Sequence, residues 1–156
     1  MNAEFINPFI NAATNVLKTM AAITPEAGKP YLKTDSKTWG VVTGIIGMAG
    51  NEISGNMVIS FDQGSILEIV NKMLMESYTE VSDEVVDAVG EITNMITGGA
   101  KKELSESGCV FEMATPVMLK GQGTELKQLA AVPVIVLPFT TGAGKFVIEA
   151  NLARRK

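Results

Sequence analysis

Three stretches of the chain carry apolar residues at the spacing of an amphipathic helix. The first is expected to begin at Asn7-Pro8, an N-cap residue followed by a proline at the first helical position. Pro25 and Gly28 are expected to end it. Its apolar stripe consists of Ile10, Ala13, Leu17 and Met20.

The second and third helical stretches each follow a side chain that can accept hydrogen bonds at an N-cap. Asp62 precedes the second stretch and Ser82 the third, which is expected to run to about Leu104 and stop near Gly108. The two apolar stripes are Ile66, Ile69, Val70, Met73 and Leu74, then Val85, Val89, Ile92, Ile96 and Ala100.

Short apolar runs between glycine-containing turns predict strands. Residues 39–48 and 56–61 flank a turn bracketed by Gly50 and Gly55, a pattern typical of a hairpin. Four further runs after the third helix predict antiparallel strands. They cover residues 109–115, 117–119, 129–139 and 145–151.

An internal repeat relates the two halves of the chain. The segment NAATNVLKTMA from Asn11 resembles GEITNMITGGA, which begins 79 residues later at Gly90. GNMVIS from Gly55 likewise resembles GKFVIE from Gly144. We therefore predict an α+β fold in which two pseudo-repeated helix-plus-hairpin halves share one mostly antiparallel sheet. The long helices are expected to pack on one face of it, and residues 1–156 to form a single domain.

The composition of the chain limits its expected cellular location and the classes of partner that it can bind. The chain has 156 residues, 46% of them apolar, yet no apolar run reaches the ~20 residues that a membrane span needs. Its N-terminus lacks the basic and apolar regions of a signal peptide. The formal net charge is −4, and the largest basic clusters are Lys101-Lys102 and residues 154–156. These features predict a cytoplasmic protein that binds neither membrane nor nucleic acid.

Two residue counts limit the chemistry. The chain has no histidine, which excludes Ser-His-Asp and Cys-His catalysis and any histidine-ligated metal site. Its single cysteine, Cys109, lies in an apolar run and is expected to be a buried strand thiol. The segment 142–145, GAGK, lacks the first glycine and the Ser or Thr of a phosphate-binding loop, so we expect a hairpin turn there. No metal site is predicted.

The third helix carries a polar ridge opposite its apolar stripe. Successive members lie four, three, four and three residues apart, which stacks them along one side of a helix. They are Asp87, Glu91, Asn94, Gly98 and Lys101. A solvated face is the ordinary interpretation, but Asn94 and the pair Gly98-Gly99 are unfavourable inside a helix. The two glycines leave bare backbone that another surface can approach, which favours a docking surface.

At these residues the sequence resembles the chemotaxis phosphatases CheX and CheC and their flagellar-switch relative FliY. The family signature is Asp or Ser, three residues, Glu, two residues, Asn, and a proline some twenty residues later. Asp87, Glu91 and Asn94 match it, and Pro116 matches it loosely. The segment NPFINAATNVLKTMA from Asn7 is similar to CheX members in particular.

The resemblance implies hydrolysis of the aspartyl phosphate of a CheY-like response-regulator receiver. In this interpretation Asn94 positions the attacking water, and Glu91 pairs with a receiver lysine. Asp87, Gly98 and Lys101 are expected to contact the partner. The receiver supplies Mg²⁺, so the chain needs no cofactor of its own.

Where the first half departs from the signature, Asn15 is present but Ala12 stands in place of the glutamate. CheX relatives form dimers through their sheets, so we expect a homodimer, with residues 41–48 as a candidate edge. The alternative function is a non-catalytic receiver-binding or flagellar-switch module of the same fold. A small-molecule hydrolase is disfavoured because the sequence offers no nucleophile and base pair.

Overall fold

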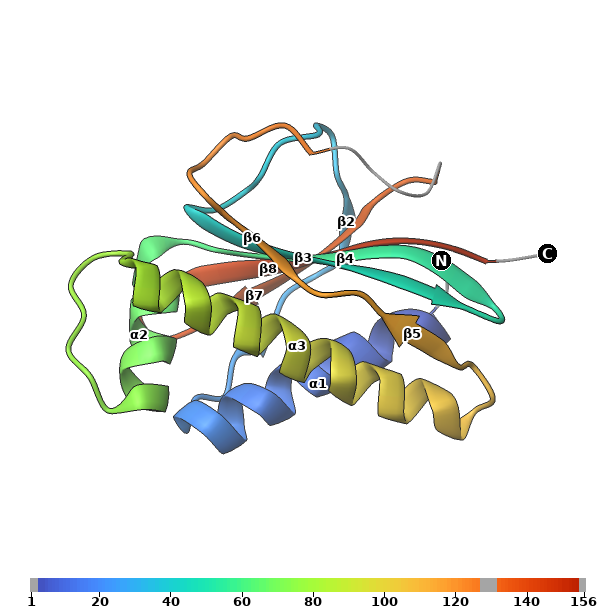
Figure 1. Ribbon diagram of the computed structural model, residues 1–156, viewed down its shortest axis with the longest axis horizontal. Coiled ribbons are helices and arrows are strands. Elements are labelled where there is room, and N and C mark those ends of the chain that lie inside the picture. The colour runs from blue at the N-terminus through green and yellow to red at the C-terminus, as the bar shows by residue number, and fades with distance from the viewer. Residues whose placement is uncertain (1–2, 127–131, 155–156) are drawn as a thin grey trace.

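A computed structural model describes residues 3–126 and 132–154 of the chain. Within them, three helices lie on one face of an eight-stranded sheet (Figure 1). The helices are α1 (Ala3–Ala21), α2 (Gln63–Leu74) and α3 (Asp83–Glu106). The strands are β1 (Glu26–Ala27), β2 (Tyr31–Leu32), β3 (Val42–Gly50), β4 (Ile53–Phe61), β5 (Phe111–Met113), β6 (Val117–Lys120), β7 (Ile135–Thr140) and β8 (Lys145–Arg154).

The sheet is antiparallel throughout its pairings, in the order β1-β7-β8-β4-β3-β5. Two short strands extend this path, because β2 also pairs with β7 and β6 also pairs with β3. The long strands β3, β4 and β8 form its centre, and their helix-facing side chains build the core with α1 and α3. The predicted α+β class, with one antiparallel sheet and its helices on one face, is confirmed.

The register of the central strands shows how the two halves are related. In the repeat that joins GNMVIS to GKFVIE, Ile59 corresponds to Ile148. The same two residues are paired across β4 and β8. Equivalent residues of two antiparallel strands face each other only at a local two-fold axis, so such an axis passes through this pair. The two helix-plus-hairpin halves therefore meet at the middle of the sheet.

The predicted start of the first helix is wrong. Ala3 already belongs to α1, so Pro8 lies inside the helix rather than at its first position. An internal proline removes one backbone hydrogen bond and normally disfavours a helix. Phe5, which lies in the added segment, is 4% exposed, and burial of its ring favours the extra turn.

The predicted caps of the other two helices are confirmed. An Asp62 carboxylate oxygen accepts the Ser65 backbone N–H at 2.8 Å, and the Ser82 hydroxyl accepts that of Val85 at 3.4 Å. The third helix ends at Glu106, close to the expected stop, and Gly108 has a φ of 90° just beyond it.

The predicted hairpin of β3 and β4 is present, although Gly55 lies inside β4 and the turn is at residues 51–52. The proposal that residues 41–48 form a free sheet edge is wrong. Val42–Ile45 pairs with β6 and Met48–Gly50 pairs with β5. These two strands follow α3 in the chain and cover the outer side of β3, so the edge lies on β5 and β6.

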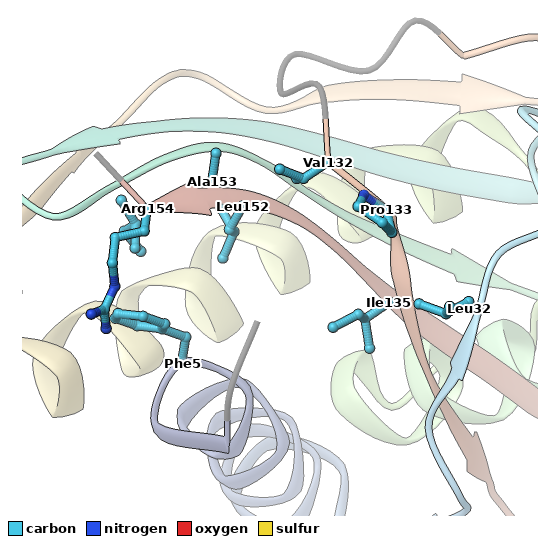
Figure 2. Close-up of a pocket in the computed structure, with 9 residues that line it drawn as sticks. Phe5, Leu32, Val132, Pro133, Ile135, Leu152, Ala153 and Arg154 are labelled. Atoms are coloured by element: carbon cyan, nitrogen blue, oxygen red, sulfur yellow. The ribbon is translucent and has the colours of Figure 1, made fainter. Parts of the chain in front are cut away.

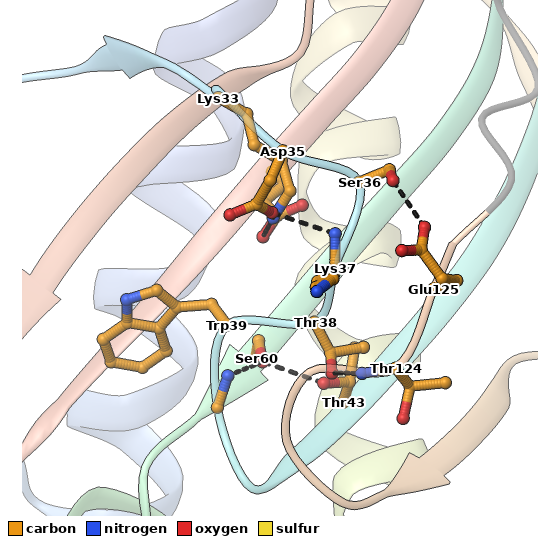
Figure 3. Close-up of polar contacts among 12 residues, drawn as sticks. Lys33, Asp35, Ser36, Lys37, Thr38, Trp39, Thr43, Ser60, Thr124 and Glu125 are labelled. Carbon is orange, nitrogen blue, oxygen red and sulfur yellow. Dashed lines mark hydrogen bonds and ion pairs between the residues drawn. The ribbon is translucent and has the colours of Figure 1, made fainter.

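The sheet face opposite the helices is covered by a strap, defined here as residues 33–41, together with residues 121–126 (Figure 3). Buried hydroxyls connect these segments to the sheet. Ser60 accepts the backbone N–H of Gly40 at 2.7 Å and lies 2.8 Å from the Thr43 hydroxyl. Thr38 accepts the backbone N–H of Thr124 at 2.9 Å. Polar groups on this face of the sheet are therefore shielded from water.

On the helix side, α3 lies against β3 and β6 at two glycines. A Cβ built on Gly44 would overlap the Thr93 hydroxyl, which donates to the Val89 carbonyl at 2.7 Å. A Cβ on Gly90 would lie 2.9 Å from the Met118 sulfur. The absence of side chains at these positions lets the helix approach the sheet closely and fixes which side of it faces outward.

Gly44→Ala should destabilise the protein by about 1–3 kcal/mol, because the added methyl overpacks the contact between α3 and β3. Urea unfolding followed by circular dichroism measures this change. The penalty should shrink when the same substitution is made in Thr93→Ala, which removes the hydroxyl that the methyl meets. Equal penalties in the two backgrounds would contradict the close-approach explanation.

Candidate functional site

The polar ridge of α3 faces outward as its spacing predicts. Asp87 and Glu91 are exposed, and Asn94, Gly98 and Lys101 are partly exposed. On the opposite side of the helix the apolar stripe is buried in the core, with Val85, Val89, Ile92, Ile96 and Ala100 each 0% exposed. The structure thus brings all five predicted site residues onto one face.

Glu91 and Asn94 form the chemically distinctive pair on this ridge. They are one helical turn apart, a separation that places Cβ atoms about 5–6 Å from each other. None of the hydrogen bonds or ion pairs between described residues uses the Glu91 carboxylate or the Asn94 amide. Their neighbour Thr93 is buried and bonded to the backbone of its own helix. A rigid turn therefore presents one carboxylate and one amide that are available to an outside group.

The two glycines of α3 have different surroundings. A Cβ on Gly98 would meet no atom within 4 Å, so this glycine leaves bare backbone on the ridge, as predicted. A Cβ on Gly99 would lie 3.1 Å from the Cβ of Ala12. Gly99 is itself exposed, so both glycines leave accessible backbone, but Gly99 also serves the packing of α3 against α1.

Lys101, at the end of the ridge, has a partner within the chain. Its ammonium lies 3.7 Å from a carboxylate oxygen of Glu112 on β5. The Glu112 side chain is 87% exposed, and exposed ion pairs of this kind contribute only about 0–1 kcal/mol. The lysine can exchange this weak pairing for a contact with another protein.

The corresponding part of α1 differs for a packing reason. Ala12, which stands where the repeat places Glu91, is 5% exposed and packs against Gly99. A carboxylate at this position would be buried in the helix contact rather than presented to solvent. Asn15 is exposed but has no carboxylate one turn before it. Of the two helices that the repeat relates, α3 presents the pair and α1 does not.

A cavity of about 530 Å³ lies away from the ridge (Figure 2). Eight of its nine lining residues are of apolar type, and the Arg154 guanidinium lies 5.0 Å from the centre of the Phe5 ring. It is lined by Phe5, Leu32, Ile53, Val132, Pro133, Ile135, Leu152, Ala153 and Arg154. Sequence patterns did not predict this cavity, because its residues come from five separate segments.

The turn between β7 and β8 is a hairpin turn, as expected, rather than a phosphate-binding loop. The backbone N–H groups of Ala143 and Lys145 donate to the carboxylates of Glu68 and Asp62, at 3.0 and 2.9 Å. Carboxylates thus occupy the donors that a phosphate would need. In residues 3–126 and 132–154, no three His, Cys, Asp or Glu side chains are grouped to hold a metal ion, and no helix is long and apolar enough to cross a membrane.

A buried ion pair on the other face of the sheet was not predicted. The Lys33 ammonium donates to Glu149 at 2.8 Å, and the side chains are 8% and 1% exposed. Burial raises the pKa of the Glu149 carboxyl, although the lysine opposes the shift. A glutamate inside the apolar strand run KFVIEAN was the available signal, because such a residue needs a buried partner.

Comparison with known proteins identifies the family of this chain. Residues 42–140 match the family described as chemotaxis phosphatase CheX. The CheY-P phosphatase CheX of Thermotoga maritima is 25% identical over 134 residues, 85% of each chain. The crystal structure of the chemotaxis protein CheX from Vibrio vulnificus is 45% identical with a TM-score of 0.88, covering 98% of this chain and 100% of that one.

A structure of a complex shows a relative with its partner. The CheX-CheY-BeF3-Mg²⁺ complex from Borrelia burgdorferi matches with a TM-score of 0.78 and 27% identity, over 97% of this chain and 98% of that one. The family match spans most of the sheet together with α3 and its ridge. On this evidence the chain belongs to the CheX family of chemotaxis phosphatases.

Proposed function

We propose that this protein hydrolyses the aspartyl phosphate of a CheY-like receiver, with Asn94 positioning the attacking water. The observation that carries the proposal is the Glu91 and Asn94 pair, which α3 presents outward without partners among the described residues. Membership of the CheX family supports a phosphatase role for the helix that carries this pair. The T. maritima relative is named as a CheY-P phosphatase, and the B. burgdorferi relative is bound to CheY.

Phosphoryl transfer needs a water held in line with the leaving group and compensation for the developing charge. A neutral amide can donate to and accept from a water, but it is too weak a base to take its proton. The contribution of Asn94 is therefore geometric. We assign Mg²⁺ to the receiver, and the CheX-CheY-BeF3-Mg²⁺ complex of the B. burgdorferi relative supports this assignment.

Glu91 is suited to anchor the receiver. Its carboxylate is exposed one turn before Asn94, where it can pair with a lysine of the partner. Such a pair sets the position of α3 along the receiver and thereby places the amide. Asp87, Gly98 and Lys101 extend the contact surface to both sides of the pair.

The release of inorganic phosphate from a phosphorylated CheY-like receiver, with and without this protein, tests the proposal directly. Acceleration by catalytic amounts supports a phosphatase. Binding without acceleration would instead establish the non-catalytic receiver-binding module.

Cytoplasmic location and homodimer formation stay predictions, and light scattering measures whether the protein forms a dimer. A dimer through a sheet edge on this side would use β5 or β6 rather than β3.

Asn94→Ala should lower the rate of dephosphorylation roughly 100-fold or more, because the water loses its positioning group. Binding to the phosphorylated receiver and the thermal unfolding temperature should stay near their original values. The matched control is Asn15→Ala, which removes an exposed amide from the equivalent place on α1 and should leave turnover unchanged. Near-normal turnover in Asn94→Ala, or loss of turnover in Asn15→Ala, would contradict the assignment.

Glu91→Lys should weaken receiver binding, and a matching lysine-to-glutamate change on the receiver should restore part of it. A charge pair that becomes buried in the complex is worth about 2 kcal/mol or more when one partner is removed. Titration calorimetry of the four combinations gives the coupling energy. Strictly additive effects for every tested receiver lysine would exclude the anchor role.

Gly98→Gln should impair receiver binding while raising the stability of the free protein by up to about 1 kcal/mol, since glutamine is the better helix former. Gly98→Ala is the matched control, because it gives a similar gain in stability with far less bulk on the ridge. Binding is measured by calorimetry and stability by urea unfolding. If Gly98→Gln binds and turns over as well as Gly98→Ala, the receiver does not contact this backbone.

A further inference from the structure

Two buried threonines lie on the sheet side of α3, in the segment that carries Glu91 and Asn94. Thr93 and Thr97 are each 0% exposed, although most of the buried residues of this helix are apolar. Valine has nearly the same shape as threonine and no polar atom. A buried hydroxyl is costly unless it forms a hydrogen bond, so packing alone does not explain why both positions carry one.

Each of these hydroxyls donates to a main-chain carbonyl one helical turn earlier. The Thr93 hydroxyl lies 2.7 Å from the Val89 carbonyl oxygen, and the Thr97 hydroxyl lies 2.8 Å from that of Thr93. In an α-helix the same two carbonyls also accept the backbone N–H groups of Thr93 and Thr97. A second donor at a helical carbonyl changes the local path of the helix, and bonds of this kind often bend it.

The two hydrogen bonds act on peptide groups next to the site residues. The Thr93 carbonyl belongs to the peptide bond that leads into Asn94, and the Val89 carbonyl lies two residues before Glu91. The hydroxyls therefore constrain the backbone from which the amide and the carboxylate project.

The sheet lies against the same part of α3. A Cβ built on Gly44 of β3 would overlap the Thr93 hydroxyl and lie 3.3 Å from Cγ1 of Val89, the residue whose carbonyl this hydroxyl reaches. The Thr97 hydroxyl lies 3.7 Å from the Met57 sulfur on β4. Both hydroxyls thus lie between the helix and the sheet, where water does not compete for their bonds.

We propose that Thr93 and Thr97 are positioning residues for dephosphorylation, which set the path of α3 and thereby the place of the Asn94 amide relative to Glu91. This inference rests on the function proposed above for that pair. Holding a water in line with a phosphoryl group tolerates little displacement, because a misplacement of about 1 Å can lower a rate roughly 100-fold. A smaller shift of the helix is therefore enough to slow the step, while exposed contacts with the receiver adapt to it.

Two double variants separate positioning from packing. Thr93→Val with Thr97→Val removes both hydroxyls, and each carbonyl keeps its backbone N–H, so no unpaired group is left. Thr93→Ser with Thr97→Ser keeps both hydroxyls but removes two buried methyl groups, which should lower stability. The midpoint of urea unfolding should therefore be near or above the original value for the valine variant and below it for the serine variant.

The rates of dephosphorylation should follow the opposite order. With a CheY-like receiver phosphorylated by acetyl phosphate, the valine variant should have a kcat roughly 3–10-fold below that of the unchanged protein and a KM within about twofold of it. The serine variant should keep the original kcat. A role in packing alone predicts instead that the less stable serine variant is the more impaired of the two.

A valine variant with the original kcat would overturn the proposal, as would a serine variant that is as slow as the valine variant. A higher KM with an unchanged kcat would also overturn it, because the hydroxyls would then serve receiver binding. Each of these outcomes differs from failure of the phosphatase proposal. In that case the unchanged protein does not accelerate phosphate release at all, and the positioning role is excluded with it.

Discussion

The close contact between α3 and the strand pair β3 and β6 determines the outward surface of this protein. Gly44 and Gly90 have no side chains where Thr93 and Met118 lie, so the helix packs directly on the sheet. A helix held this closely cannot roll about its axis without collision. The apolar stripe is therefore fixed inward, and Glu91 and Asn94 are fixed outward. The geometry of the candidate site follows from this contact rather than from interactions among the site residues themselves.

The site is incomplete by construction. In the proposed function, Glu91 on α3 anchors the receiver and Asn94 positions the water. The receiver would then supply the metal ion and the acidic pocket that hold the phosphoryl group. Such a division suits a rigid helix that docks, because an exposed amide without internal partners loses no hydrogen bond when it meets a water in the complex.

Different interactions stabilise the two faces of the sheet. On the helix side, apolar side chains from both halves pack around the local two-fold axis at Ile59 and Ile148. On the strap side, buried hydroxyls and the Lys33–Glu149 pair hold a polar layer. Replacing a satisfied buried ion pair by apolar groups seldom costs stability, whereas removing one partner does. Oε1 of Glu149 and Oδ1 of Asn56 are buried among the described residues without a hydrogen-bond partner.

Local interactions let the sequence alone determine much of this protein. Helical spacing, the Asp62 and Ser82 caps and the outward ridge depend on residues within a few positions of each other, and all were predictable. The repeat also predicted two related halves. The tertiary structure decided those features that depend on contacts between segments far apart in the sequence. Burial of Phe5 moved the start of α1, β5 and β6 covered β3, and Ala12 packed on Gly99. Each outcome follows from which surfaces meet after folding, and no local sequence pattern records that.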